Sequence, residues 1–189
     1  MPSPSEQIEA LAALYSAERS SATNLGNERL ALLALQITYL GLAVIALGSD
    51  SLPGGVWGAA FSAFPLWFIH SYHLVLVALS IVRTRSINLL EQAIYDRSGL
   101  PSDLRPLIGN KAGAMVHYAD YQPPLLKLQA AVAYGGIGAV MVVFTGYALI
   151  VAAQESGWRE APVLLAGTLY ACLFVAVSLS WRFVSRIAR

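Results

Sequence analysis

Four long segments of this chain contain no Asp, Glu, Lys or Arg, and no other feature restricts its fold so strongly. Apolar residues make up 57% of the chain and charged residues only 12%, whereas soluble domains carry roughly a quarter charged residues. Each segment is about long enough to cross a ~30 Å hydrocarbon layer as a helix. Helix is required there, because lipid leaves the N–H and C=O groups of an open backbone unpaired. The segments are Leu30–Gly48, Val56–Val82, Gln129–Ala153 and Ala161–Trp181.

The sequence therefore predicts an all-α integral membrane protein with four transmembrane helices. The second segment is the longest, so we expect it to tilt or bend. The first 29 residues are polar and do not resemble a cleavable signal peptide, so the first span is expected to act as its own insertion signal. The expected parts are a cytoplasmic amphipathic helix (1–29), a transmembrane hairpin (30–82), a cytoplasmic loop (83–127), and a second hairpin with a short basic tail (128–189).

The distribution of basic residues predicts the orientation of the spans. Of twelve Lys and Arg residues, two precede the first span, six lie between the second and third, and three follow the fourth. Arg159 alone falls on the other side. Cytoplasmic loops carry the excess of positive charge, so both termini should be cytoplasmic in a multi-pass protein of the cell membrane. Trp57 and Trp158 fall at the outer interface, where indole rings are favoured.

The N-terminal segment has the features of an amphipathic helix. Ser3-Pro4-Ser5-Glu6 is a good helix start, because serine and a glutamate three residues later can cap each other's backbone N–H groups. An apolar stripe then recurs at helical spacing, with Glu18 interrupting it. The stripe either packs on the protein's own cytoplasmic surface or binds a partner or a second copy. Its members are Ile8, Leu11, Tyr15, Ala22 and Leu25.

The middle loop is the largest soluble piece. Residues 86–97 are predicted to form a helix that ends before Gly99 and Pro101, in the positions where such residues follow a helix. About 45 residues cannot hold an independent core of useful size. We therefore expect the loop and the N-terminal helix to form one small cap, with Pro123-Pro124 opening the third span.

Two features of this loop could contact a ligand. The segment Gly109-Asn110-Lys111-Ala112-Gly113 is either an ordinary turn or a weak phosphate contact, since it lacks the spacing and the Lys-Ser/Thr pair of a P-loop. Aromatic and basic side chains nearby could hold a nucleotide signal by stacking and charge, or could form an interfacial belt. These candidate ligand-binding residues are Arg105, Lys111, His117, Tyr118 and Tyr121.

The most distinctive feature within the spans is a histidine pair. His70 lies near the centre of the second apolar segment, and His73 shares its helical face, as do Ser62 and Ser80. Polar side chains at such depth are functional candidates by default. The four residues could line a pore or gate, because imidazole changes charge near neutral pH. The alternatives are a metal or haem ligand set completed by a second subunit, a proton relay, and a structural pair bonded to polar side chains of other helices. The available partners are Gln36, Tyr39, Thr145, Tyr147 and Tyr170.

Small residues at four-residue spacing mark possible close contacts between helices. Such rows serve either packing within the chain or contacts between subunits. The rows are Ala131, Gly135 and Ala139 in the third span, and Gly167 and Ala171 in the fourth.

The sequence lacks the motifs that are typical of several classes of protein function. The single cysteine, Cys172, is expected to be buried in the fourth span, and alone it cannot form an intrachain disulfide or a dithiol redox pair. The sequence contains no zinc-protease helix, hydrolase nucleophile elbow or dinucleotide fingerprint. We therefore expect no enzyme, no cofactor or metal, and no nucleic-acid binding, since topology accounts for the basic residues.

The chain resembles uncharacterised four-span membrane proteins of high-GC bacteria. The resemblance rests on Tyr15-Ser16-Ala17-Glu18-Arg19, Asn24 and Asn27 leading into residues 31–47, and on Pro65–His73 followed by Arg83–Glu91. Its layout is also similar to the membrane effectors and sensors of bacterial antiphage systems. That resemblance implies a cytoplasmic part that senses a signal and spans that oligomerise or open a leak, in antiviral defence.

Two functions from different classes follow. The first is a homo-oligomeric, channel-like effector or sensor in the membrane, gated from its cytoplasmic side. The second is a membrane scaffold that recruits a soluble cytoplasmic partner through the N-terminal helix and the loop. A small transporter or membrane enzyme is the third alternative, and the lack of intramembrane Asp and Glu counts against proton-coupled transport.

The predicted orientation can be tested with topology reporters. After Arg189, a reporter that is active only in the cytoplasm should give a signal and one that is active only in the periplasm should not, because the basic residues keep the tail in the cytoplasm. The same pair of reporters inserted near Arg159 should give the opposite pattern. A periplasmically active fusion after Arg189 would overturn the orientation.

Overall fold

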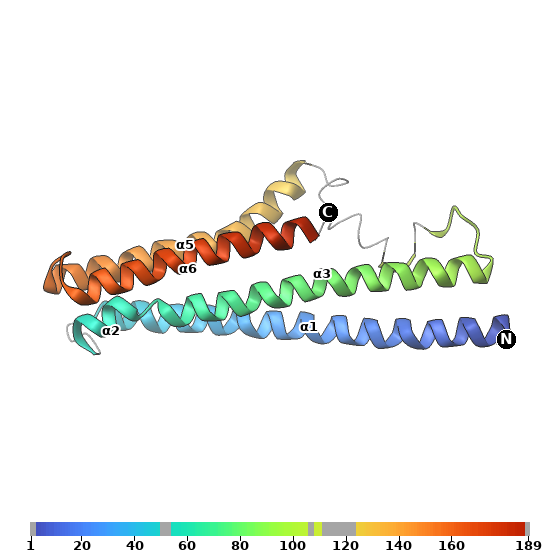
Figure 1. Cartoon of the computed structure of the whole chain (residues 1–189), viewed down its shortest axis with the longest axis horizontal. Coiled ribbons are helices and arrows are strands. Elements are labelled where there is room, and N and C mark those ends of the chain that lie inside the picture. Colours follow the sequence, from blue (N-terminus) through green and yellow to red (C-terminus); the bar gives the residue numbers. More distant parts are fainter. Residues whose placement is uncertain (1–2, 50–53, 106–107, 111–123, 188–189) are drawn as a thin grey trace. The chain divides into compact units, whose positions relative to one another are not determined.

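The structure is a computed structural model of the chain, and it describes residues 3–49, 54–105, 108–110 and 124–187. Every long element among these residues is a helix: α1 (Pro4–Leu47), α2 (Gly55–Phe61), α3 (Phe64–Ser98), α5 (Pro124–Ser156) and α6 (Ala161–Ile187) (Figure 1). Within this described part, four helical stretches are long and apolar enough to cross a membrane: Ser5–Leu47, Gly55–Ser98, Gly135–Ser156 and Ala161–Phe183. The prediction of an all-helical chain with four helices of membrane-spanning length is confirmed.

The helix ends follow the local sequence signals. At the start of α1, the Ser3 N–H donates to Glu6 Oε2 (2.6 Å) and the Glu6 N–H donates to Ser3 Oγ (3.3 Å), which is the predicted reciprocal cap. α3 ends at Ser98, and Gly99 follows with a φ of 68° that glycine adopts at little cost. The helix predicted over residues 86–97 is the end of α3 and not a separate element. No Gly or Pro interrupts α3 between Pro65 and Gly99.

The chain divides into two compact units. Unit 1 comprises residues 1–28 and 76–131, and unit 2 comprises residues 29–75 and 132–189. In unit 1 the first part of α1 runs antiparallel to the second part of α3 (Figure 1, blue beside green). Gln7 accepts a hydrogen bond from Arg97 (3.4 Å), and Glu18 forms an ion pair with Arg83 (2.7 Å).

The apolar stripe of the N-terminal helix faces α3 in unit 1. Its side chains are less exposed than their neighbours, and Glu18 continues the stripe instead of interrupting it, because Arg83 pairs with its carboxylate. Ile87, only 2% exposed, is the most completely buried large side chain of α3 in this unit. The stripe therefore packs on the protein itself.

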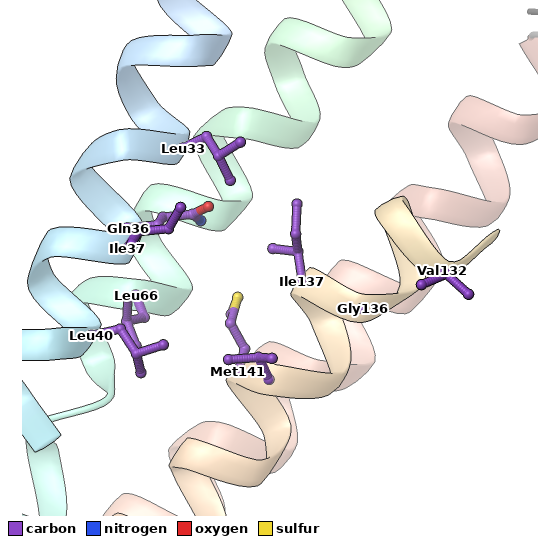
Figure 2. Close-up of a pocket in the computed structure, with 10 residues that line it drawn as sticks. Leu33, Gln36, Ile37, Leu40, Leu66, Val132, Gly136, Ile137 and Met141 are labelled. Carbon is purple, nitrogen blue, oxygen red and sulfur yellow. The ribbon is translucent and has the colours of Figure 1, made fainter. Parts of the chain in front are cut away.

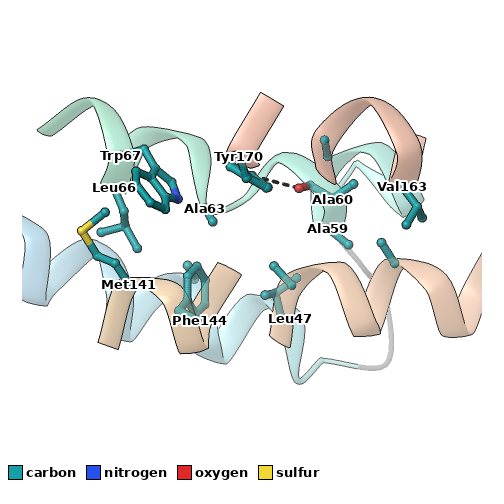
Figure 3. Close-up of a cluster of buried hydrophobic side chains, with 14 of the residues drawn as sticks. Leu47, Ala59, Ala60, Ala63, Leu66, Trp67, Met141, Phe144, Val163 and Tyr170 are labelled. Atoms are coloured by element: carbon teal, nitrogen blue, oxygen red, sulfur yellow. Dashed lines mark hydrogen bonds between the residues drawn. The ribbon is translucent and has the colours of Figure 1, made fainter. Parts of the chain in front are cut away.

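Unit 2 has a continuous apolar core built from all its helices (Figure 3). α2 packs against α6. Trp67 Nε1–H donates to Thr145 Oγ1 (2.9 Å), and the Trp67 ring meets Phe174 edge-on with centroids 6.4 Å apart. Small side chains allow the helices to approach closely. Those that are at most 1% exposed are Ala59, Ala60, Ala63, Ala148, Ala152 and Ala166.

The predicted rows of small residues are not the ones that pack within unit 2. A Cβ added at Gly135 or Gly167 would meet nothing within 4 Å. Ala139 and Ala171 are exposed, and the side chain of Ala131 lies outside the described ones. The buried face of α5 instead carries Met141, Phe144, Thr145, Ala148 and Ala152. Four-residue spacing identifies a face of a helix and does not say which face meets the other helices.

Cys172 is exposed on α6, whereas the sequence analysis expected a buried thiol. The buried face of α6 carries Val163, Ala166 and Tyr170. Cys172 lies two residues beyond Tyr170 and therefore falls on the opposite side of the helix. The thiol faces away from the core of this unit.

The second apolar segment is interrupted between α2 and α3, in agreement with the expected bend. Pro65 lies in the first turn of α3, where its missing N–H is tolerated. The interruption leaves backbone carbonyls without their helical donors. Tyr39 from α1 donates to Ser62 O (2.7 Å), and Tyr170 from α6 donates to Ala60 O (2.9 Å; Figure 3, dashed line).

Removing the Tyr170 hydroxyl should therefore destabilise unit 2. Tyr170→Phe keeps the ring but leaves the carbonyl of Ala60, a fully buried residue, without this donor. We expect a loss of about 1–3 kcal/mol in stability, seen as a lower midpoint for thermal unfolding of the full chain in detergent. Tyr147→Phe on α5 is the matched control, because Tyr147 is 40% exposed. Equal midpoints for the two variants would contradict the role given to Tyr170.

Candidate functional site

His70 and His73 lie one turn apart on α3, with their rings stacked. The centroids are 6.4 Å apart, and the planes differ by 12°. His73 is 9% exposed and His70 is half-buried. The Nδ1 atoms of both rings are buried and have no hydrogen-bond partner among the described residues.

Three of the hydroxyls considered as partners for this pair form hydrogen bonds elsewhere. Tyr39 and Tyr170 donate to the backbone at the α2–α3 interruption, and Thr145 donates to Met141 O (2.7 Å). The specific pairing with Tyr39, Thr145 or Tyr170 is therefore not what the structure shows. Ser62 and Ser80 bond within their own helical turns, to Ala59 O and Leu76 O, each at 2.8 Å.

Two polar residues of α1 lie in the same unit as the histidines. Gln36 is only 6% exposed, and neither its amide oxygen nor its amide nitrogen has a partner in the described part of the chain. The Nε atom of Arg29 is also buried and unpaired there, and the charge of Arg29 acts on His73. We call Arg29, Gln36, His70 and His73 the polar seam. Gln36 was predicted only as a possible partner of the histidines and Arg29 was not predicted as a site residue, although a spacing of seven places both on one face of α1.

His70 also lines a cavity of about 400 Å³ within unit 2. The cavity lies between α3, α5 and α6, and its walls are apolar except for His70 and Ser178. Gly138 and Ala139 border it from α5, and Trp67 and Phe174 lie across from them. A water in this cavity would have His70 and Ser178 as its polar partners among the described lining residues, which is the smallest number that normally holds a buried water.

A second polar cluster centres on Glu91 in unit 1. Glu91 is 3% exposed, and its Oε1 accepts hydrogen bonds from the Tyr15 hydroxyl (2.9 Å) and from the Asn110 backbone N–H (2.7 Å). Tyr15 lies outside the apolar segment Leu30–Gly48, and burial together with the hydrogen bond to Glu91 raises the pKa of its phenol. The hydroxyl therefore remains a donor at neutral pH. Glu91 connects α1, α3 and the start of the loop.

The candidate phosphate turn begins against this carboxylate. Gly109 has a φ of 71°, and a Cβ there would lie 2.7 Å from Glu91 Oε1 and 2.6 Å from the Tyr95 hydroxyl oxygen. Only glycine fits this approach. Because the Asn110 N–H donates to Glu91, it is not available to a phosphate group in this arrangement.

Arg105 stabilises the end of α3. Its guanidinium donates to the carbonyls of Leu100 (3.2 Å) and Tyr95 (3.4 Å) and forms an ion pair with Asp96 (2.7 Å). These contacts satisfy carbonyls at a helix C-terminus, where a cation is also favoured by the helix dipole. The other candidates for ligand binding lie outside the described residues, namely Lys111, His117, Tyr118 and Tyr121.

Comparison with protein-family models, with curated proteins and with solved structures finds no match to this chain. Among the described residues, no three His, Cys, Asp or Glu side chains gather in a group that could hold a metal ion. The functional argument therefore rests on the polar seam and on the Glu91 cluster.

Replacing Glu91 should loosen unit 1. Glu91→Ala leaves the Tyr15 hydroxyl and the Asn110 N–H without their acceptor, which should cost about 1–3 kcal/mol. Hydrogen exchange of the full-length protein should show faster exchange at the Asn110 amide and along the first part of α1. Gln92→Ala is the matched control, because Gln92 is the exposed neighbour on the same helix. If both variants exchange alike, the Glu91 cluster does not hold the unit together.

Proposed function

We propose that this chain is an oligomeric multi-pass membrane protein that acts as a channel-like effector or sensor, with both termini in the cytoplasm. The observation that carries the proposal is the polar seam, a set of buried polar atoms without partners within apolar helices. Unit 1, built from the N-terminal helix and the middle loop, is the proposed cytoplasmic gate.

The energetic cost of leaving the polar seam unpaired favours contact with water or with a second copy of the chain. Each buried donor or acceptor left unpaired costs about 1–3 kcal/mol. Polar side chains at membrane depth normally face a bundle interior or a water-filled cavity. His70 beside its 400 Å³ cavity is placed for either partner, water or a second copy of the chain.

The outer surface of unit 2 supports assembly. The small residues Gly135 and Ala139 on α5, and Gly167 and Ala171 on α6, have space beside them in the single chain. Backbones of membrane helices approach one another most closely at such residues. An assembly of two to five copies would use these faces.

A membrane scaffold that recruits a soluble partner is the second candidate. Unit 1 leaves large apolar side chains exposed, namely Leu14, Leu89, Leu104 and Ile108. Exposed apolar surface outside the spans is the usual feature of a protein-binding face. This function requires no water in the polar seam.

The histidine pair distinguishes these functions. In liposomes, the wild-type protein should release a trapped dye, and replacing both His70 and His73 with Phe should abolish the release while membrane insertion continues. The aromatic side chains fill the space but cannot bind water or protons.

Single conservative changes provide the control. His70→Gln and His73→Gln keep hydrogen-bonding capacity and should leave insertion and expression unchanged. A wild-type protein that inserts correctly but releases no dye would favour the scaffold. Equal release from the wild type and the double Phe variant would exclude the histidines from the pore.

Assembly can be tested at the outward-facing row. Gly135→Leu should leave the fold of the single chain intact, because the added side chain meets open space. It should lower the number of subunits seen by native mass spectrometry in mild detergent, because it separates the backbones at the contact. Gly41→Leu on α1 is the matched control, since Gly41 is also exposed and unobstructed. A monomeric wild type would contradict the proposed assembly.

A further inference from the structure

A second cavity in unit 2 has the features of a ligand site. It lies between α1, α3 and α5 and encloses about 310 Å³ (Figure 2). Binding sites for small molecules begin at roughly this volume and are mostly apolar, with a few polar groups that fix the orientation of the ligand. The aliphatic walls include Leu33, Leu40 and Leu66 on one side and Ile137 and Met141 on the other.

Among the described residues, Gln36 is the only one with a polar side chain in the wall of this cavity. It is 6% exposed, and both ends of its amide are unpaired within the described residues. In Figure 2 the amide end extends from α1 toward the space that Ile137 and Met141 border. The buried amide therefore has one acceptor and two donors that are unpaired at the wall of the cavity.

The arrangement is costly unless a ligand uses it. A leucine at position 36 would match the other wall residues and would leave no polar group unpaired, whereas a buried amide without partners is destabilising. Gly136 lines the same cavity, and a Cβ there would meet nothing within 4 Å, so the space stays open because this residue lacks a side chain. The unpaired amide of Gln36 and the open space beside Gly136 therefore belong to the same cavity.

The rim of the cavity indicates how a ligand would enter. Ile37 and Val132 line it and are 62% and 64% exposed, so the cavity opens at the apolar outer surface of the helices. A molecule that partitions into hydrocarbon can reach such an opening directly. None of the described residues that line the cavity is Lys or Arg, so these residues offer no counter-charge to a charged headgroup.

We propose that this cavity binds one aliphatic chain that ends in a neutral hydroxyl-bearing group, an alcohol or a protonated carboxylic acid. The hydroxyl donates to the Gln36 amide oxygen and accepts from its amide nitrogen, while the chain lies among the leucine, isoleucine, valine and methionine side chains. This inference concerns binding alone and does not require the chain to form a pore.

Photolabelling of the full-length protein in lipid nanodiscs tests the site. Three probes share one medium-length chain with a photoactivatable diazirine and differ only at the end, which is an alcohol, a carboxylic acid or a methyl group. The alcohol or the acid should label residues of the cavity wall saturably, with competition by the same unlabelled compound. If only one of these two probes labels the wall, its end group shows whether the cavity binds an alcohol or a carboxylic acid. Labelling by the methyl-ended probe should be weaker by about threefold to tenfold, the value of one hydrogen bond.

Two variants address the two parts of the site. Gln36→Leu should reduce labelling by the hydroxyl probe to the level of the methyl-ended probe. Gly136→Leu should block labelling of the cavity by every probe, because its side chain fills the space. Gly138→Leu is the matched control, since Gly138 lies two residues away, lines the His70 cavity instead and is also unobstructed.

The same experiment can overturn the proposal. Equal labelling by the hydroxyl and methyl-ended probes would show that the Gln36 amide does not select a ligand. Equal labelling of the Gly136→Leu and Gly138→Leu variants would show that the labelled position is ordinary lipid-facing surface. Loss of labelling only at Gly136→Leu, together with the response to Gln36→Leu, supports the site whether or not the protein releases dye from liposomes.

Discussion

Backbone groups that water cannot reach must be paired within the protein, and the interruption between α2 and α3 is where unit 2 depends on this constraint. Pro65 has no N–H to continue a helix, and α2 ends at Phe61 while α3 begins at Phe64. The carbonyls of Ala60 and Ser62 then take their hydrogen bonds from Tyr170 and Tyr39. Because these tyrosines belong to α6 and α1, their hydrogen bonds connect two further helices to the turn between α2 and α3. The core of unit 2 is assembled around that turn.

The two units differ in how far their buried polar side chains are paired. In unit 1, Glu91 and Glu18 each bind partners through one carboxylate oxygen, while the second oxygen of each is buried and unpaired among the described residues. In unit 2, both amide atoms of Gln36 and the Nδ1 atom of His73 have no partner among the described residues. An apolar environment makes unpaired groups more costly than they are near water. The fold of the single chain does not account for these unpaired atoms of Gln36 and His73, whereas partners outside the chain would.

Sequence signals predicted the features that depend on neighbouring residues. The cap at Ser3 and Glu6, the end of α3 before Gly99 and the helix start at Pro124 all follow from local chemistry. Features that depend on which helix faces meet could not be predicted in this way. Periodicity alone cannot distinguish the buried row of α5 from the open one at Gly135. The role of Glu91 was also missed, since a single carboxylate in a helix gives no sign of the two distant donors that it binds.

The glycines of α5 connect the remaining observations. Gly136 and Gly138 line different cavities, the one that contains Gln36 and the one that contains His70, and each is open because no side chain projects into it. Ala139 borders the His70 cavity and also belongs to the exposed row with Gly135. A second copy of the chain that packed along this row would therefore cover the His70 cavity and determine whether water or protein reaches the imidazole. The proposed assembly and the environment of His70 would thus be coupled physically. Among the described residues, the Gln36 cavity shares only Met141 with the lining of the His70 cavity, so the proposed ligand would not depend on this contact.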